Sequence, residues 1–338
     1  GSLPARQVSM RIGLPIESSA VTVNQNCASG MRAMEIACHN VMLGKTEIGL
    51  VVGVENMTQA PFMLPKARMG YRMGDIPTGG SAALYDAMLH DALYDSLVPG
   101  HMGVTADNVA KLCGVTRQEC DELAVISHNR ACAAVDGGKF VKEIAPFVIQ
   151  KKKGDLIIDT DEHPIRNCTY ETLSKMKPVF TPDGVTTAAN ASGINDGAAA
   201  IILASAEAVE KYGLKPMAKL IGWGQGGVDP KIMGVGPVPA CNQAMKKADL
   251  KIEDIDLVEA NEAFAAQSIA VARELGFDMA KVNVNGGAIS IGHPVGASGA
   301  RIIVTLLHEM QKRDDAKLGM ATLCIGGGMG VATIFEKC

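Results

Sequence analysis

The 338-residue sequence has few of the features that assign a chain to a class at once. No apolar run reaches the roughly 18 residues that a membrane-spanning helix needs, so we expect a soluble protein that spans no membrane. The formal net charge is only −4, which argues against a nucleic-acid-binding protein. Aromatic residues make up 4% of the chain, which disfavours a ligand site lined with aromatic rings.

The cysteines lack the pattern of a zinc site or of a disulfide framework. There are nine of them, their spacing is irregular and no two form a CxxC pair, so we expect no metal and a reducing, cytoplasmic compartment. The chain does contain 47% hydrophobic residues and 37 glycines. Such a composition is enough for a full core in two or three lobes with many tight turns.

One cysteine stands out by its neighbours, in the stretch VNQNCASGMRAM from Val23 to Met34. β-branched residues precede it, small residues follow Cys27, and apolar residues then recur at helical spacing, which predicts a strand, a sharp turn and a helix. The amino end of a helix favours a thiolate, the form in which cysteine is a nucleophile. The alternative is a small buried hydrophobic residue, which is the commoner role of a free cysteine.

The chain contains an internal repeat. ASGMR at 28–32 recurs as ASGAR at 297–301, and each copy is followed by a helical stretch and a glycine-led apolar strand, at 49–54 and 319–325. The half that contains the second copy begins near Ala218, so more sequence precedes the second copy in its half than precedes the first copy. By this comparison the first half is short of about 50 residues.

Between the two copies, glycine and proline interrupt a long excursion over 57–101, of the kind that covers a site or forms an oligomer contact. Three lysines at 151–153 are more typical of a solvated turn than of a phosphate contact. The elements expected here and before the first copy are helices over 4–13, 82–93, 103–112, 116–135 and 171–176, and a hairpin of strands at 147–150 and 156–160.

The second half alternates strands and helices. Strands are expected at 255–260 and 282–285, each leading into a loop or helix, which indicates an α/β sandwich with largely parallel pairing. The glycine-rich run GGAISIGHPVGASG matches neither a P-loop nor GxGxxG, so a nucleotide-phosphate site is disfavoured.

This run holds a histidine, His293, in a glycine loop between a strand and a helix, where it can reach a neighbouring site and act as a base. A second thiol, Cys324, opens CIGGGMG at 324–330, whose backbone N–H groups could bind an oxyanion. If the two ASG units meet about a pseudo-twofold axis, Cys27, His293 and Cys324 lie in one pocket.

Taken together, the chain resembles the thiolase family of acetyl-CoA C-acyltransferases. The resemblance runs from near the start of the sequence to near its end, although the opening of the family fold is missing. The motifs that carry it are NQNCASG (24–30), HMGVTADNVA (101–110), NASGINDGA (190–198), NEAFA (261–265), GHPVGASGAR (292–301) and CIGGGMG (324–330).

The resemblance implies a ping-pong acyl transfer. Cys27 is then the acyl-accepting nucleophile, His293 the base that activates it, and Cys324 the acid/base for the second substrate. Asn261 and His293 form one oxyanion hole through a water, and the backbone N–H groups of Cys27 and Gly326 form the other. Cleavage of a β-ketoacyl thioester does require a nucleophile, a second proton carrier and two sites for negative oxygen.

The resemblance also implies a substrate channel. Ser192, His101, Met102 and Phe264 match positions that line the pantetheine channel and the acyl pocket, and Arg166 lies near where the family meets the CoA nucleotide. Because Met102 shortens the acyl pocket, the HMG motif favours acetoacetyl-CoA. A broader-range 3-ketoacyl-CoA thiolase is the alternative.

The implied fold is α/β, with duplicated α/β/α/β/α layers and an inserted loop/cap domain. The expected division is an N-terminal half at 1–57 completed by 190–214, a loop/cap domain at 58–189, and a C-terminal half at 215–338.

The partners that the resemblance implies are acyl-CoA and CoA, with CoA as substrate and no cofactor, and the implied assembly is a homotetramer or homodimer. The excursion resembles a tetramer-forming loop, with added length at 78–82.

Two other classes remain open. A decarboxylating or condensing synthase of the same fold places a histidine or another group where this chain has Cys324, so the sequence disfavours it. A non-catalytic member that binds CoA esters or lipids, or an inactive fragment, is the third reading, because unpaired sheet edges invite instability or association.

Overall fold

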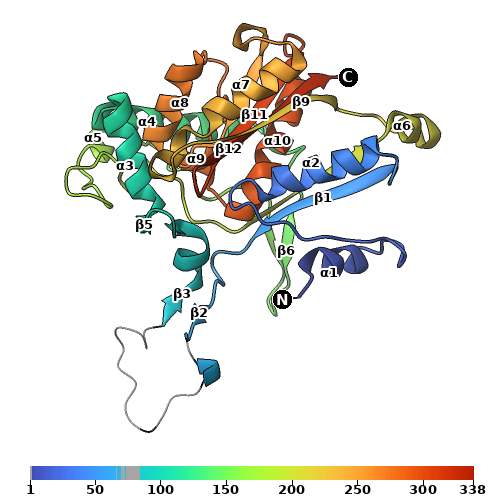
Figure 1. Cartoon of the computed structure of the whole chain (residues 1–338), viewed down its shortest axis with the longest axis horizontal. Coiled ribbons are helices and arrows are strands. Elements are labelled where there is room, and N and C mark those ends of the chain that lie inside the picture. Colours follow the sequence, from blue (N-terminus) through green and yellow to red (C-terminus); the bar gives the residue numbers. More distant parts are fainter. Residues whose placement is uncertain (1, 66, 70–72, 74–83) are drawn as a thin grey trace.

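A computed structural model describes residues 2–65, 67–69, 73 and 84–338 of the protein (Figure 1). Its larger sheet has the strand order β10-β11-β12-β9. Only β10 and β11 are parallel; the other two pairs are antiparallel, so the expectation of largely parallel pairing is wrong. The reason lies in the turn after β11, where Gly327 and Gly328 have φ of +84° and +80° and return the chain at once. The strands are β9 Ala218–Gly227, β10 Leu257–Ala260, β11 Leu318–Ile325 and β12 Met329–Lys337.

The smaller sheet pairs β1 (Ile48–Glu55) with β8 (Gly197–Ala204) in antiparallel register. Helix α2 (Ser29–Met42) precedes β1 as helix α10 (Val295–Lys312) precedes β11, so both copies of the repeat form a helix followed by a strand. In the described part of the chain, neither β1 nor β8 pairs with a further strand.

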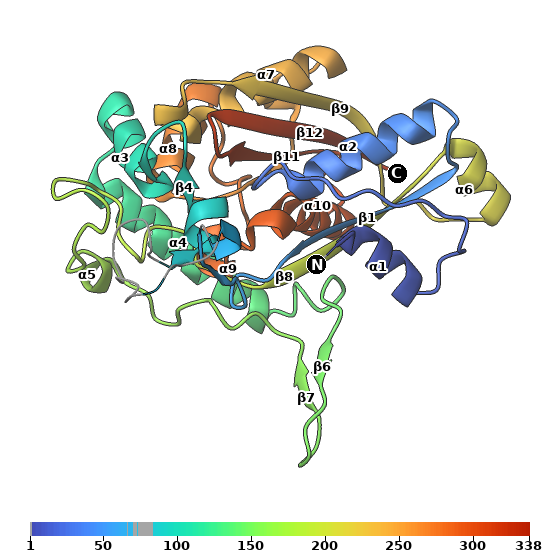
Figure 2. The same cartoon turned by 60° about the horizontal axis from the view of Figure 1, so that its bottom comes forward.

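The core lies where α2 and α10 pack between the two sheets (Figure 2). Buried side chains from both sheets meet the two helices in one cluster, and α7 (Pro237–Ala248) covers the other face of the larger sheet. The two ASG motifs form the crossing point. A Cβ on Gly30 would lie 2.7 Å from the backbone nitrogen of Ala300, and one on Gly299 would lie 2.7 Å from that of Met31. Only glycine permits this close approach.

Most of the expected elements between the copies are present. Thr116 and Glu119 form the expected capping box of α4, and the β6–β7 hairpin projects from the body in Figure 2. The other described elements are α1 Pro4–Arg11, β2 Phe62–Met63, η1 Ala67–Met69, β3 Tyr85–Asp86, η3 Leu89–Leu93, β4 Tyr94–Asp95, β5 Gly100–His101, α3 Met102–Cys113, α4 Arg117–Asp136, β6 Phe147–Ile149, β7 Leu156–Ile158, α5 Tyr170–Leu173, α6 Ala206–Tyr212, η4 Pro230–Val235, α7 Pro237–Ala248, η5 Ile252–Asp254, α8 Ala265–Leu275 and α9 Ala288–Ile291.

Two local expectations fail, and a third is met in part. Residues 21–23 form no strand, because no strand in the described part of the chain pairs with them. The segment 282–285 makes only a single parallel bridge, from Val282 to Val258. Of the helix expected over 82–93, residues 82 and 83 lie outside the described part; residues 87–93 are helical, mostly as the π-helix η3, whereas 85 and 86 form the strand β3. The insertion at 78–82 also lies outside it.

None of the helices in the described ranges has the length and apolar character to cross a membrane.

Candidate active site

The turn before α2 presents the thiol of Cys27. Asn26 has a left-handed φ of +50°, which asparagine tolerates better than most residues. Ser29 closes the turn, since its hydroxyl donates to the carbonyl of Asn26 (2.7 Å) and accepts from the N–H of Gln25 (3.0 Å). The thiol of Cys27 donates to Oδ1 of Asn26 at 3.3 Å. The side chain is buried, with 6% of its surface exposed.

The thiol of Cys27 is protonated at neutral pH. Burial raises its pKa to about 12, whereas the backbone N–H groups of Cys27 and Gly326 act against this rise. The sequence indicated a stabilised thiolate at a helix start, and that expectation is wrong for the free protein, because loss of solvation outweighs the helix terminus. A base must therefore remove the proton when the nucleophile reacts.

The loop after β11 meets this turn. Cys324 is fully buried near the end of β11, and its pKa is raised first by burial and then by its proximity to Cys27. A Cβ on Gly326 would lie 2.3 Å from Cε of Met102 and 3.1 Å from Nδ2 of Asn26. The next N–H, of Gly327, donates to the buried carboxylate of Asp95 at 2.8 Å. Asp95, which belongs to the excursion over 57–101, therefore holds the loop after β11 in place.

His293 is buried in the loop between α9 and α10, and its backbone N–H donates to the carbonyl of Gly193 at 3.1 Å. Its Nδ1 lies 2.6 Å from the hydroxyl oxygen of Ser298, and Nδ2 of Asn261 lies 3.5 Å from both ring nitrogens. Burial, and to a smaller extent the cation of Arg301, lowers the pKa of the imidazole to about 4. A neutral imidazole of this kind can act as a base.

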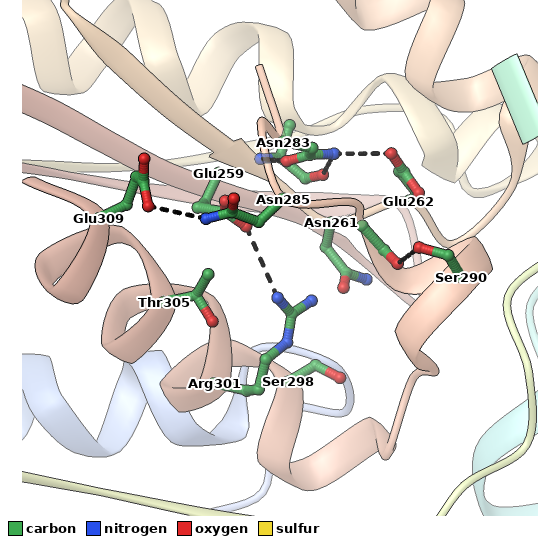
Figure 3. A network of polar contacts seen from close by, with 12 residues as sticks. Glu259, Asn261, Glu262, Asn283, Asn285, Ser290, Ser298, Arg301, Thr305 and Glu309 are labelled. Carbon is green, nitrogen blue, oxygen red and sulfur yellow. Dashed lines mark hydrogen bonds and ion pairs between the residues drawn. The ribbon is translucent and has the colours of Figure 1, made fainter. Parts of the chain in front are cut away.

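Asn261 follows β10, and its backbone N–H donates to the carbonyl of Thr322 on the neighbouring strand β11 at 2.9 Å. Its Oδ1 is buried and has no hydrogen-bond partner among the described residues. Figure 3 shows this amide among the polar side chains that lie between β10 and α10. A buried acceptor of this kind is available to a ligand or to a water.

The carboxylate of Glu262 ties the Asn261 loop to the loop of His293. It accepts from the hydroxyl of Ser127 (2.7 Å), from Nδ2 of Asn283 (2.9 Å) and from the N–H of Ile289 in α9 (3.2 Å). The carboxyl group is buried and accepts these three hydrogen bonds, which makes it a rigid support for both loops.

The residues expected to line the channel lie together. Met102, Phe264 and Cys324 share one buried cluster. Ser192 donates its N–H to the carbonyl of Ala263, next to Phe264. His101 caps α3 by accepting from the N–H of Gly103 at 3.0 Å.

Phe180 completes this wall. It stacks on the His101 ring at a centroid distance of 4.4 Å and packs edge-on against Phe264 at 6.2 Å. Arg166 lies elsewhere, since its guanidinium makes two hydrogen bonds to the exposed carboxylate of Asp136. Its proposed contact with the nucleotide stays a prediction.

Sequence reasoning missed four residues of this site: Asn26, Asp95, Phe180 and Ser298. Asn26 and Ser298 belong to quoted motifs, and their positions, one residue before Cys27 and five residues after His293, were a usable signal. Asp95 and Phe180 reach the site from segments without any motif, so only the fold reveals them. In the described ranges, no group of three or more His, Cys, Asp or Glu side chains is arranged to hold a metal ion.

Comparison with known proteins identifies the family. Residues 1–207 match the family "Thiolase, N-terminal domain" and residues 214–337 match "Thiolase, C-terminal domain". The chain belongs to the thiolase family. The resemblance drawn from the motifs is thereby confirmed.

Individual relatives of this thiolase-family chain support the assignment. It is 53% identical to an acetyl-CoA acetyltransferase of Syntrophomonas wolfei over 99% of its own length and 84% of the relative's, and 51% identical to that of Cupriavidus necator over 100% and 84%. The solved acetyl-CoA acetyltransferase of Syntrophomonas wolfei superposes with a TM-score of 0.95 at 51% identity, covering 100% of this chain and 84% of that one.

Human mitochondrial 3-ketoacyl-CoA thiolase superposes with a TM-score of 0.93 at 43% identity, covering 99% of this chain and 83% of that one. These likenesses confirm the expected thiolase fold. The exact domain bounds and the roles of single residues stay predictions.

Proposed function

We propose that the protein is an acetyl-CoA C-acetyltransferase that interconverts two acetyl-CoA with acetoacetyl-CoA and CoA through an acyl-Cys27 intermediate. The observation that carries the proposal is the convergence on Cys27 of the N–H groups of Cys27 and Gly326, beside a second buried thiol, Cys324. The acetyl-CoA acetyltransferases to which the chain is about 50% identical support the substrate.

In the first half-reaction, the sulfur of Cys27 attacks the thioester carbonyl and its proton passes to Nε2 of His293. The two converging N–H groups stabilise the oxyanion. When the tetrahedral intermediate collapses, the C–S bond to CoA breaks, and the CoA thiolate takes the proton from His293. Both groups are neutral at rest, so the transfer creates charge only as the bond forms.

In the second half-reaction, Cys324 gives its thiol proton to Nε2 of His293, and the resulting thiolate removes a proton from the methyl carbon of a second acetyl-CoA. Asn261 and His293 stabilise the enolate oxygen. The enolate carbon attacks the acyl-Cys27 carbonyl, which forms the new C–C bond; the C–S bond to Cys27 then breaks, and the Cys27 sulfur takes the proton back from Nε2 of His293. Because CoA enters and leaves as substrate and product, no separate cofactor is required.

The size of the acyl pocket decides the range of substrates. Met102 lies against Gly326, next to the nucleophile, which favours a two-carbon acyl group. The 43% identity to human mitochondrial 3-ketoacyl-CoA thiolase is the observation in favour of the alternative, a thiolase of broader range.

For the assembly, we propose a homotetramer or homodimer in the cytoplasm. The apolar side chains of Ile48, Leu50 and Ile202, exposed on the two-stranded sheet, support association because such a surface is poorly solvated.

Thiolysis of acetoacetyl-CoA tests the function. The purified chain is mixed with acetoacetyl-CoA and CoA, and the enolate absorbance is followed, with Cys27→Ser and Cys324→Ala as controls. We expect cleavage by the wild type and a loss of at least about 100-fold in each variant. Wild-type cleavage no faster than that of both variants would overturn the proposal.

A further inference from the structure

Ser298 lies in the first turn of α10, in the second ASG motif, and is fully buried. Its hydroxyl oxygen is 2.6 Å from Nδ1 of His293 and 2.9 Å from the carbonyl oxygen of Pro294. A serine hydroxyl has one proton to donate and two lone pairs to accept with. Because its proton goes to Pro294, Ser298 can only accept from the imidazole.

The other neighbour of the imidazole leads to the same result. Among the described residues, the hydrogen-bonding neighbours of the His293 ring are Oγ of Ser298 and Nδ2 of Asn261. The amide nitrogen is a donor, so Ser298 supplies the sole acceptor. A neutral imidazole carries one N–H, and a buried N–H finds an acceptor, which puts the proton on Nδ1.

We infer that Ser298 is a positioning residue that holds His293 in the Nδ1-protonated tautomer and leaves Nε2 free to take the proton of Cys27. The inference rests on the proposed function only where it assigns Nε2 the role of base toward the thiol of Cys27. The wrong tautomer of a catalytic histidine removes the base without disturbing the fold, as mutation of the orienting residue shows in other enzymes.

Arg301, one turn further along α10, supports this assignment. Its guanidinium is 3.6 Å from the carboxylate of Glu259, and Figure 3 shows it on the same helix face as Ser298. A nearby buried cation disfavours a second proton on the imidazole. Ser298 thus fixes which nitrogen is protonated, while Arg301 and burial keep the ring neutral.

The internal repeat provides an independent comparison. Ser29 occupies the same position in the first ASG motif, and its hydroxyl also donates to a preceding carbonyl, that of Asn26, while accepting from an N–H, that of Gln25. Each serine therefore makes hydrogen bonds that hold in place the loop carrying a catalytic side chain. In the second copy the donor is the His293 ring itself.

Nitrogen-15 NMR of the wild-type protein labelled in histidine tests the inference directly. The signals of His293 are assigned among the seven histidines by their loss in His293→Asn. Near neutral pH we expect a protonated Nδ1 and a bare Nε2. Protonation at Nε2 overturns the inference, whether or not the protein turns over acetyl-CoA, so this readout separates it from the proposed function.

Kinetics of Ser298→Ala supply the second test, with Thr305→Val as the matched control. Thr305 is a buried hydroxyl residue on the same helix that bonds Glu143 instead of His293. We expect acylation of Cys27 to slow about 10- to 100-fold in Ser298→Ala with little change in KM, and both tautomers to appear in its spectrum. Thr305→Val keeps the wild-type rate and tautomer.

An equal loss in both variants, or a wild-type rate in folded Ser298→Ala, contradicts the positioning role. If Ser298→Ala does not fold, the wild-type spectrum still decides the question.

Discussion

The backbone N–H of Gly326 lies near enough to the sulfur of Cys27 to lower the pKa of that thiol against the effect of burial. The loop after β11 and the turn before α2 belong to opposite halves of the chain, and they meet at this contact. The nucleophile and its oxyanion donors are thus assembled from both copies of the repeat. Disturbing either loop is expected to affect the same chemical step.

The reactivity of Cys27 should depend on pH as a buried thiol does. Its pKa is raised to about 12, so the thiolate fraction is small at neutral pH and grows about tenfold per pH unit up to that value. We expect its alkylation by iodoacetamide, measured by peptide mass in the free protein, to rise steadily through the alkaline range. A plateau at neutral pH would instead mean a preformed thiolate.

Asp95 should matter for catalysis although it touches no reacting atom. Its carboxylate accepts from the N–H groups of Gly327 and Leu97, both at 2.8 Å. We expect Asp95→Ala to loosen the loop of Gly326 and to lower kcat about tenfold. Asp86→Ala is the control, since Asp86 makes the same kind of bond to Met88 within the excursion. Equal effects of the two variants on kcat would remove this role.

The crossing of α2 and α10 should not accept a methyl group. In Gly30→Ala or Gly299→Ala the new Cβ meets backbone atoms at 2.7 Å, so we expect the free energy of unfolding to fall by about 1–3 kcal/mol in urea titrations. Gly49→Ala is milder, because its Cβ meets only the Ala37 side chain at 3.3 Å. If all three variants are equally stable, the crossing is not tightly packed.

Met102 should limit the acyl chain. Met102→Ala removes the side chain that lies against Gly326, so we expect the ratio of kcat/KM for a longer 3-ketoacyl-CoA to that for acetoacetyl-CoA to rise about tenfold. Met233→Ala, in the same buried cluster, is the control. An unchanged ratio in Met102→Ala would show that another wall sets the limit.

Local patterns predicted much of this molecule. The capping box of α4, the β6–β7 hairpin and both repeat units form where their turn residues and periodicity indicated. The strand directions could not be read this way, because the apolar runs of β11 and β12 fit either pairing and the short turn at Gly327 decides it.

The site was predictable in its motif residues but not in its electrostatics. The helix start at Cys27 suggested a thiolate, whereas burial, a property of the whole fold, reverses the sign of the pKa shift. Asp95 and Phe180 lie in segments without a motif, so only the packing around Gly327 and His101 brings them into the site.

The most direct test of the account is the intact mass of the protein after exposure to acetyl-CoA, followed by peptide mapping. We predict one acetyl increment on Cys27 in the wild type and also in Cys324→Ala, which forms the acyl-enzyme but does not carry out the condensation. Absence of the increment in the wild-type chain, or its presence on a residue other than Cys27, would contradict the account.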